Sequence, residues 1–148
     1  MNEKSILDDL APCGLSCRKC FAFKNGEIGH HSRALKDLLG NFDVYAERFS
    51  EFLPPFEDYP AFKRLLGYLA SPDCEGCRKG TCKWPDCGVQ ACFRGKGVDF
   101  CFECDEFPCT KTNFDEHLRK RWVRMQSRMK EIGVSAYIEE TENRSRYR

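Results

Sequence analysis

The spacing of apolar residues predicts three short helices in the first half of the chain. Between residues 32 and 70, apolar positions recur every three or four residues, which is the repeat of an amphipathic helix. Helix-breaking residues at Gly40-Asn41, Pro54-Pro55 and Ser71-Pro72 divide the stretch and end each segment. The apolar positions are Leu35, Leu38 and Leu39, then Tyr45, Phe49, Phe52 and Leu53, and finally Tyr59, Phe62, Leu66 and Leu69.

A longer apolar stripe predicts one long C-terminal helix over 110–133. Asn113 or Thr110 is expected to cap its first turn, and Gly133 to end it, because glycine readily adopts the conformation that closes a helix. A short helical piece over 135–142 and a frayed tail over 143–148 are expected to follow. Steps of three or four residues separate the members of the stripe, which are Phe114, Leu118, Trp122, Met125, Met129 and Ile132.

The stretch between these two parts, residues 72–110, has no helical period. Cysteines recur there every five residues, at 77, 82, 87 and 92. Five residues rotate a helix by about 500°, so one helix cannot direct all four thiols to a common point. The stretch is also rich in glycine and proline, and we predict turns, knuckles and short helical or strand pieces. Its apolar content is too low to order it without a bound metal.

The chain has eleven cysteines in 148 residues, and they carry its candidate chemistry. An odd number excludes complete disulfide pairing within one chain. The first twelve residues hold three acidic side chains and no apolar core of a secretory signal, so we expect a reducing, cytoplasmic location. Three Cys-x2-Cys pairs have the spacing with which one turn binds a metal ion. We therefore predict two or three structural zinc ions, held by Cys13, Cys17, Cys20, Cys74, Cys77, Cys82, Cys87, Cys92, Cys101, Cys104 and Cys109.

The spacing leaves the grouping of these ligands open. Cys74 and Cys77 can share one ion with the Cys101 and Cys104 pair, or Cys82, Cys87 and Cys92 can be joined by Cys109. A histidine ligand from His30, His31 or His117 would bring the number of sites close to three. The same soft thiolate set accepts an iron–sulfur cluster, so an iron–sulfur or thiol redox protein is the first alternative.

The spacing Cys13-x3-Cys17-x2-Cys20 also occurs in radical S-adenosylmethionine enzymes. Those enzymes need a large parallel βα framework, and this chain has no βα alternation and carries Lys19 where an aromatic residue is usual there. No nucleophile elbow, phosphate loop or HExxH zinc motif occurs in the sequence. The fold class that we predict is an α-rich small metal-bound domain over 1–142, with an irregular zinc-knuckle-like centre and no catalytic residues. We expect a non-catalytic binding or adaptor module.

Charge adds a second alternative. The formal net charge is only +1, yet residues 111–130 hold seven lysines and arginines against two acidic residues. A basic helix beside zinc knuckles is typical of nucleic-acid-binding proteins, so a zinc-dependent nucleic-acid-binding protein is the second alternative. The other interpretation of these basic residues is a solvated helix face. No apolar run reaches the length of about 20 residues that crosses a membrane. The residues that would contact nucleic acid are Arg119, Lys120, Arg121, Arg124 and Arg128.

The order and spacing of three motifs resemble a known family. The motifs are Ala11-Pro-Cys13-Gly-Leu-x-Cys17-x2-Cys20, Cys74-x-Gly-Cys77 and Phe100-Cys101-x2-Cys104-x-Glu-Phe-Pro-Cys109. They resemble the cysteine-rich prokaryotic family catalogued as domain of unknown function 3795, and the segment 129–134 is similar to its C-terminal part. The resemblance implies a small, presumed metal-binding protein without an established activity. It also implies that Cys82 and Cys87 are the least secure ligands, since the family usually holds a closer pair there.

Overall fold

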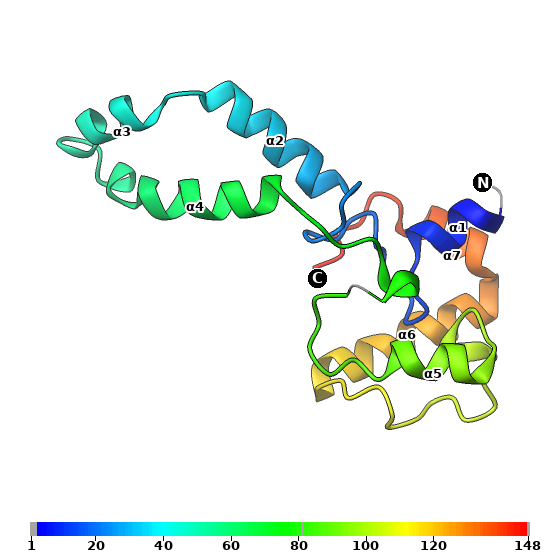
Figure 1. Ribbon diagram of the computed structural model, residues 1–148. Coiled ribbons are helices and arrows are strands. Elements are labelled where there is room, and N and C mark those ends of the chain that lie inside the picture. The colour runs from blue at the N-terminus through cyan, green and yellow to red at the C-terminus, as the bar shows by residue number, and fades with distance from the viewer. Residues whose placement is uncertain (1–2, 81, 148) are drawn as a thin grey trace. The chain divides into compact units, whose positions relative to one another are not determined.

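The computed structural model describes residues 3–80 and 82–147, and the side chains of these residues from Ile6 onward (Figure 1). The described residues form seven α-helices and three short 3-10 helices, and none of them lies in a β-strand. The expectation of a helix-rich chain is therefore confirmed. The chain divides into two compact units, one made of Met1–Lys19 together with Cys74–Arg148 and the other of Cys20–Asp73. Whether both unfold together, as the single domain predicted from the sequence would, stays a prediction.

The unit Cys20–Asp73 contains the three helices expected from the apolar period. They are α2 (Glu27–Leu39), α3 (Asp43–Ser50) and α4 (Tyr59–Ala70), and a 3-10 turn, η1 (Pro54–Asp58), precedes the last. Helices α2 and α4 pack along each other, and α3 lies where the chain turns between them (Figure 1). The breaks fall where the sequence placed them, since Gly40 caps the end of α2 and Ser71 caps the end of α4.

Aromatic rings hold the turn of this unit together. The ring of Phe42 lies 6.1 Å from that of Phe49 and 5.9 Å from that of Phe56, and the latter two rings are 5.4 Å apart. Such centroid distances are typical of favourable aromatic pairs. Within α2, an added Cβ at Gly29 would lie 2.7 Å from the Pro72 side chain, so this glycine lets the two ends of the hairpin approach each other.

The other unit is built around helix α6 (Glu116–Ile132). It also contains α1 (Glu3–Asp9), η2 (Cys77–Lys79), α5 (Val89–Lys96), η3 (Cys101–Glu103) and α7 (Val134–Thr141). The predicted stripe of α6 faces inward, since Trp122 and Met129 are almost fully buried. The core cluster that the stripe joins consists of Ile6, Leu10, Phe100, Met129 and Tyr137.

The start of α6 differs from the prediction. The helix begins at Glu116, and its cap is Asp115, whose carboxylate accepts a hydrogen bond from the Leu118 amide at 2.9 Å. Neither Thr110 nor Asn113 caps it. Asn113 instead has a positive φ of 56°, and its side-chain amide donates to the Asp86 carbonyl at 2.9 Å. That contact spans 27 residues. This hydrogen bond holds the chain in a turn at a place where the local sequence pattern predicts that the helix continues.

The segments outside the long helices are turns and short helical pieces. Residues 72–110 contain such pieces, as expected, and α5 is the longest of these. In the tail, the carbonyl of Arg144 accepts from Lys19 at 3.1 Å and the carbonyl of Arg146 accepts from Arg121. That the tail frays stays a prediction. Among the described residues, no helix combines the length and apolar character required to cross a membrane.

Candidate metal centre

All eleven cysteines lie within the described residues, and all are free thiols. Cys13, Cys17 and Cys74 are buried, and the others are half-buried. The sequence left two groupings of the central cysteines open. The structure shows a third arrangement, in which seven of the thiols form two neighbourhoods.

The first neighbourhood is a small cavity that four cysteines line. Cys92 comes from α5, Cys101 from η3, and Cys104 and Cys109 from the segment that follows; we call this cavity the Cys101 pocket. Its volume is about 20 Å³. A space of about 10–15 Å³ already accommodates one water-sized sphere, so the cavity has room for a single atom.

The indole of Trp122 forms part of the same cavity. Its Nε1 is buried and makes no hydrogen bond of ordinary geometry with the described residues. The same N–H group interacts with the Cys101 sulfur, where it opposes the effect of burial, which raises the pKa of that thiol to about 11. A thiolate is a much better acceptor than a thiol, because it carries a full negative charge. The indole N–H is therefore placed where a deprotonated Cys101 would satisfy it.

Close packing behind the pocket places Cys109 and Cys92. The ring of Phe107 meets the Trp122 indole edge to face at a centroid distance of 5.0 Å. On the other side, the Gly88 amide donates to the Thr112 carbonyl at 3.2 Å. A Cβ at Gly88 would lie only 1.9 Å from the Lys111 carbonyl oxygen, so only glycine permits this approach. The start of α5 is thereby held against the segment that follows Cys109.

Positive charge surrounds the Cys101 pocket. Lys96 and Lys111 line it, and each forms an ion pair with Glu106. The hydrogen bonds from these two lysines lower the pKa of Glu106 to about 2. A zinc ion with four thiolates carries a net charge of −2, which nearby cations compensate.

The second neighbourhood consists of the thiols of Cys17, Cys77 and Cys82, which we call the Cys77 group. The Cys77 thiol forms hydrogen bonds with the other two. These bonds lower the pKa of Cys17 to about 7 and that of Cys82 to about 6, and they raise the pKa of Cys77. The hydrogen bonds therefore favour the thiolate form of Cys17 and Cys82 and the thiol form of Cys77.

Arginines anchor the Cys77 group. Arg78 donates to the Leu7 carbonyl at 2.9 Å and to the Asp99 carbonyl at 2.8 Å, which ties η2 to both α1 and the start of η3. Arg146 lowers the pKa of Cys17 and of Cys82 through its charge.

The remaining four cysteines lie outside these two neighbourhoods. Burial raises the pKa of Cys13 to about 12, and this thiol is close enough to Cys101 and Cys87 to sense their charge. The sulfur of Cys74 accepts a hydrogen bond from the Gly76 amide at 3.4 Å. Cys20 belongs to the other unit, Cys20–Asp73.

A buried glutamine connects the loop before Cys13 with the turn after Cys101, and the sequence analysis missed it. Gln126 is fully buried on α6; its amide nitrogen donates to the Pro12 carbonyl at 3.0 Å, and its amide oxygen accepts from the Phe102 amide at 2.8 Å. Pro12 precedes Cys13 and Phe102 follows Cys101. A polar residue between Met125 and Met129 of the apolar stripe was the signal that could have indicated this role.

The described residues do not form a closed metal site. No three of their Cys, His, Asp or Glu side chains are arranged so that they could hold a metal ion directly. His30 and His31 are exposed on α2 with their rings 5.2 Å apart, and His117 is exposed at the start of α6. The Cys101 pocket nonetheless gathers four cysteines, whose sulfurs are ligands that soft divalent ions prefer.

The fold and the thiol neighbourhoods define a small, helix-rich, cysteine-rich protein. The chain belongs to the family described as protein of unknown function (DUF3795), whose model matches residues 9–114. The match contains all eleven cysteines and confirms the family resemblance seen in the cysteine motifs. It ends before α6, so the segment 129–134 lies outside it. No curated protein and no solved structure matches the chain.

Proposed function

We propose that this protein is a non-catalytic metal-binding module whose cysteines hold structural zinc. The observation that carries the proposal is the Cys101 pocket, where four cysteines and the indole of Trp122 line a space of about 20 Å³. Hydrogen bonds from N–H donors to ligand sulfurs are a regular feature of the shell around metal ligands. Cys92, Cys101, Cys104 and Cys109 would hold one ion, which would crosslink α5, η3 and the segment before α6.

The Cys77 group supports a second ion in the same unit. Its three thiols are hydrogen-bonded to one another, and two of them have a lowered pKa, so they lose their protons readily to a metal. Three sulfurs leave one position of a tetrahedral site to another ligand. Two ions of this kind agree with the two or three predicted from the number of cysteines.

The same group also supports the alternative of an iron–sulfur or thiol redox protein. Thiolates with a pKa near neutrality are the reactive form of cysteine, and iron–sulfur clusters are held by the same ligand. Zinc and iron–sulfur are therefore candidates for one set of sulfurs, and the metal content of the protein distinguishes them.

Elemental analysis of protein purified without oxygen tests both proposals. We expect two or three zinc ions per chain and a colourless sample. A brown sample with iron and acid-labile sulfide would establish the cluster and overturn the zinc proposal. Protein that folds with neither metal would overturn both.

Paired substitutions test the grouping of the ligands. We expect C101S/C104S to lower the zinc content by one ion per chain, and C17S/C77S to lower it by one other ion. H117Q is the matched control, because His117 is exposed in the same unit, and it should leave the zinc content unchanged. Loss of all zinc in either double variant would show that the thiols do not form two independent sites.

A further inference from the structure

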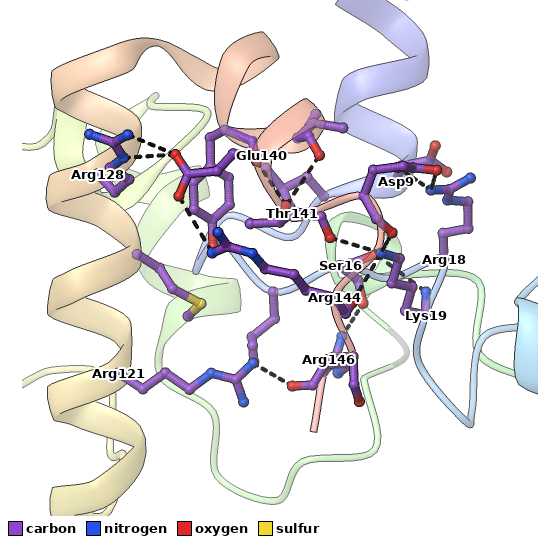
Figure 2. A pocket seen from close by; sticks show the side chains of 18 of the residues that line it. Asp9, Ser16, Arg18, Lys19, Arg121, Arg128, Glu140, Thr141, Arg144 and Arg146 are labelled. Carbon is purple, nitrogen blue, oxygen red and sulfur yellow. Dashed lines mark hydrogen bonds and ion pairs between the residues drawn. The ribbon is translucent and has the colours of Figure 1, made fainter. Parts of the chain in front are cut away.

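A second cavity lies in the unit formed by Met1–Lys19 and Cys74–Arg148, apart from the four cysteines of the Cys101 pocket (Figure 2). The segment 9–19, helices α6 and α7 and the tail line it, and we call it the arginine pocket. Its volume is about 480 Å³. Pockets of about 300–1,000 Å³ are typical of sites for small molecules.

The charge of the arginine pocket is strongly positive. Seven arginine and lysine side chains line it, against three carboxylates, in a protein whose formal net charge is +1. Arg121, Arg124 and Arg128 stand on successive turns of α6, while Arg144 and Arg146 come from the tail. Charges of one sign that face a shared concave space raise the local concentration of ligands of the opposite sign.

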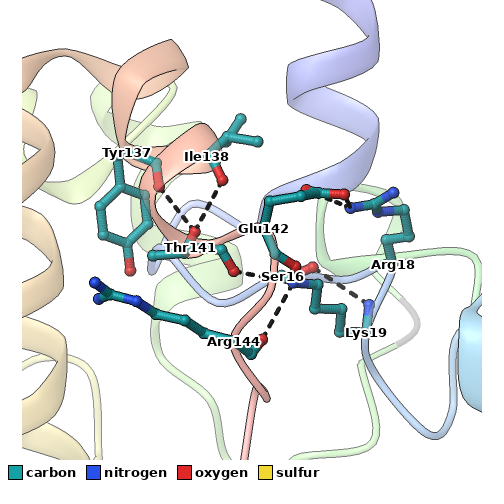
Figure 3. A network of polar contacts seen from close by, with 8 residues as sticks. All are labelled: Ser16, Arg18, Lys19, Tyr137, Ile138, Thr141, Glu142 and Arg144. Atoms are coloured by element: carbon teal, nitrogen blue, oxygen red, sulfur yellow. Dashed lines mark hydrogen bonds and ion pairs between the residues drawn. The ribbon is translucent and has the colours of Figure 1, made fainter.

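Some of these cations build the wall of the pocket. Lys19 donates to the carbonyls of Thr141 at 3.0 Å and Arg144 at 3.1 Å, which secures the end of α7 and the tail (Figure 3). Arg18 pairs with the Glu142 carboxylate at 2.7 Å, and Arg128 pairs with Glu140 at 2.8 Å. These groups keep their positions because each is already bonded within the protein.

Two arginines of the pocket have donors to spare. Arg124 is exposed and makes no hydrogen bond or ion pair with the described residues. Arg144 has one ion pair with them, a long contact of 3.4 Å to Glu140, which Arg128 already engages more closely. A guanidinium group presents five N–H donors in a planar fork that matches the oxygens of phosphate. The pocket therefore contains two guanidinium groups that can bind an anion without breaking a strong contact.

Five apolar or aromatic side chains also line the pocket. Leu10 and Leu15 contribute from the segment before Lys19, Met125 from α6, and Tyr137 and Ile138 from α7. An inorganic ion would leave this part of the cavity without a partner. A ligand with an anionic group at one end and an apolar or aromatic group at the other would fill both parts.

We propose that the arginine pocket binds a small phosphomonoester, with its phosphate on Arg124 and Arg144 and its organic part against Met125 and Tyr137. The nucleic-acid contact considered from the sequence is less well supported. Of the five residues that it needs, Arg119 and Lys120 do not line the pocket, and Lys120 pairs with Glu116. The other three face a cavity of small-molecule size, whereas a polymer requires an extended series of cations.

Calorimetric titration of protein purified without oxygen tests the proposal, with inorganic phosphate, ribose 5-phosphate and AMP as probes. We expect one AMP or one ribose 5-phosphate per chain, bound more tightly than phosphate and more weakly at high salt. The relative affinity of the two esters shows whether the apolar wall accepts a base. R124A and R144A should each weaken binding by about tenfold or more, the effect of losing a charge-assisted hydrogen bond.

R119A is the matched control, because Arg119 is an exposed arginine on the same helix outside the pocket, and it should bind like the unaltered protein. The zinc content of R124A and R144A should also be unchanged, so the result does not depend on the metal proposal. Three results would overturn the proposal: no binding of either ester, equal affinity for AMP and phosphate, or equal losses in R119A and R124A. Binding of a 20-nucleotide single strand without binding of AMP would overturn it in favour of nucleic acid.

Discussion

The side-chain amide of Gln126 donates a hydrogen bond to the carbonyl of Pro12 at 3.0 Å, in the interior of the unit that carries ten of the eleven cysteines. The same Pro12 carbonyl accepts from the Cys101 amide at 3.1 Å, and the Gln126 oxygen accepts from the Phe102 amide at 2.8 Å. One buried side chain, 114 residues from Pro12 in the sequence, therefore joins the loop that contains Cys13 to the turn that contains Cys101.

Replacing Gln126 by methionine should destabilise the protein, because it preserves the size of the side chain and removes both hydrogen bonds. The buried Phe102 amide would lose its acceptor, which typically costs about 1–3 kcal/mol. Equilibrium unfolding in urea measures this loss. Ser127→Ala, at the next, exposed position of α6, should change the unfolding free energy by no more than about 0.5 kcal/mol. An unchanged urea midpoint for Gln126→Met would show that the contact contributes nothing.

Two glycines of the α5 region should respond to alanine in opposite directions. A Cβ at Gly88 would meet the Lys111 carbonyl at 1.9 Å, so Gly88→Ala must displace the segment behind the Cys101 pocket and should destabilise the protein by about 1–3 kcal/mol. Gly95 lies inside α5 with nothing within 4 Å of an added Cβ. Gly95→Ala should stabilise the helix by about 0.5–1 kcal/mol.

Thermal unfolding of the two alanine variants side by side checks this pair. The comparison is informative because the chemical change is the same in both. A Gly88→Ala protein as stable as Gly95→Ala would mean that α5 can move away from Lys111 without loss, and that the close approach is not required.

Removal of the Trp122 N–H should weaken metal binding. In Trp122→Phe the ring remains and the donor to Cys101 is lost, and partners of metal ligands typically contribute about 10–100-fold in affinity. Competition with a zinc chelator measures the change. Phe114→Leu is the control, since the Phe114 ring packs on Trp122 at 6.2 Å but leaves the indole N–H in place. If both variants held zinc equally well, the N–H would have no part in the site.

The ion pair between Asp43 and Lys63 should make the unit Cys20–Asp73 sensitive to acid. The Lys63 ammonium holds the pKa of Asp43 below its ordinary value of 3.8. A lowered pKa in the folded state contributes stability above that ordinary value, and the contribution is lost as the pH falls through the folded pKa. Helix content followed by circular dichroism below pH 4 should therefore fall less steeply in Asp43→Asn than in the unaltered chain.

Both partners of this pair are exposed, so the effect should be small and screened by salt. Acid titration in 0.5 M sodium chloride serves as the internal comparison, because the two chains should then behave alike. A steeper acid transition in Asp43→Asn would contradict the assigned role of the carboxylate.

Local signals were sufficient for the helices of Cys20–Asp73. Gly40 and Ser71 end α2 and α4 because their conformations close helices whatever surrounds them, and the apolar period between them requires only neighbours along the chain. The start of α6 could not be predicted from local signals. Asn113 adopts its positive φ with the help of a hydrogen bond to Asp86, and a partner 27 residues away leaves no trace in a local pattern.

The sequence by itself determined that the chain is rich in helices, that it belongs to its family and that it is rich in thiols. Periodicity, motif spacing and the number of cysteines are properties of the chain alone. Tertiary structure decided which sulfurs share a neighbourhood, how Trp122 and Gln126 support them, and that Arg124 and Arg144 face one cavity. These relationships join residues that are distant in sequence. They depend on how the helices pack, and only the folded chain brings the side chains together.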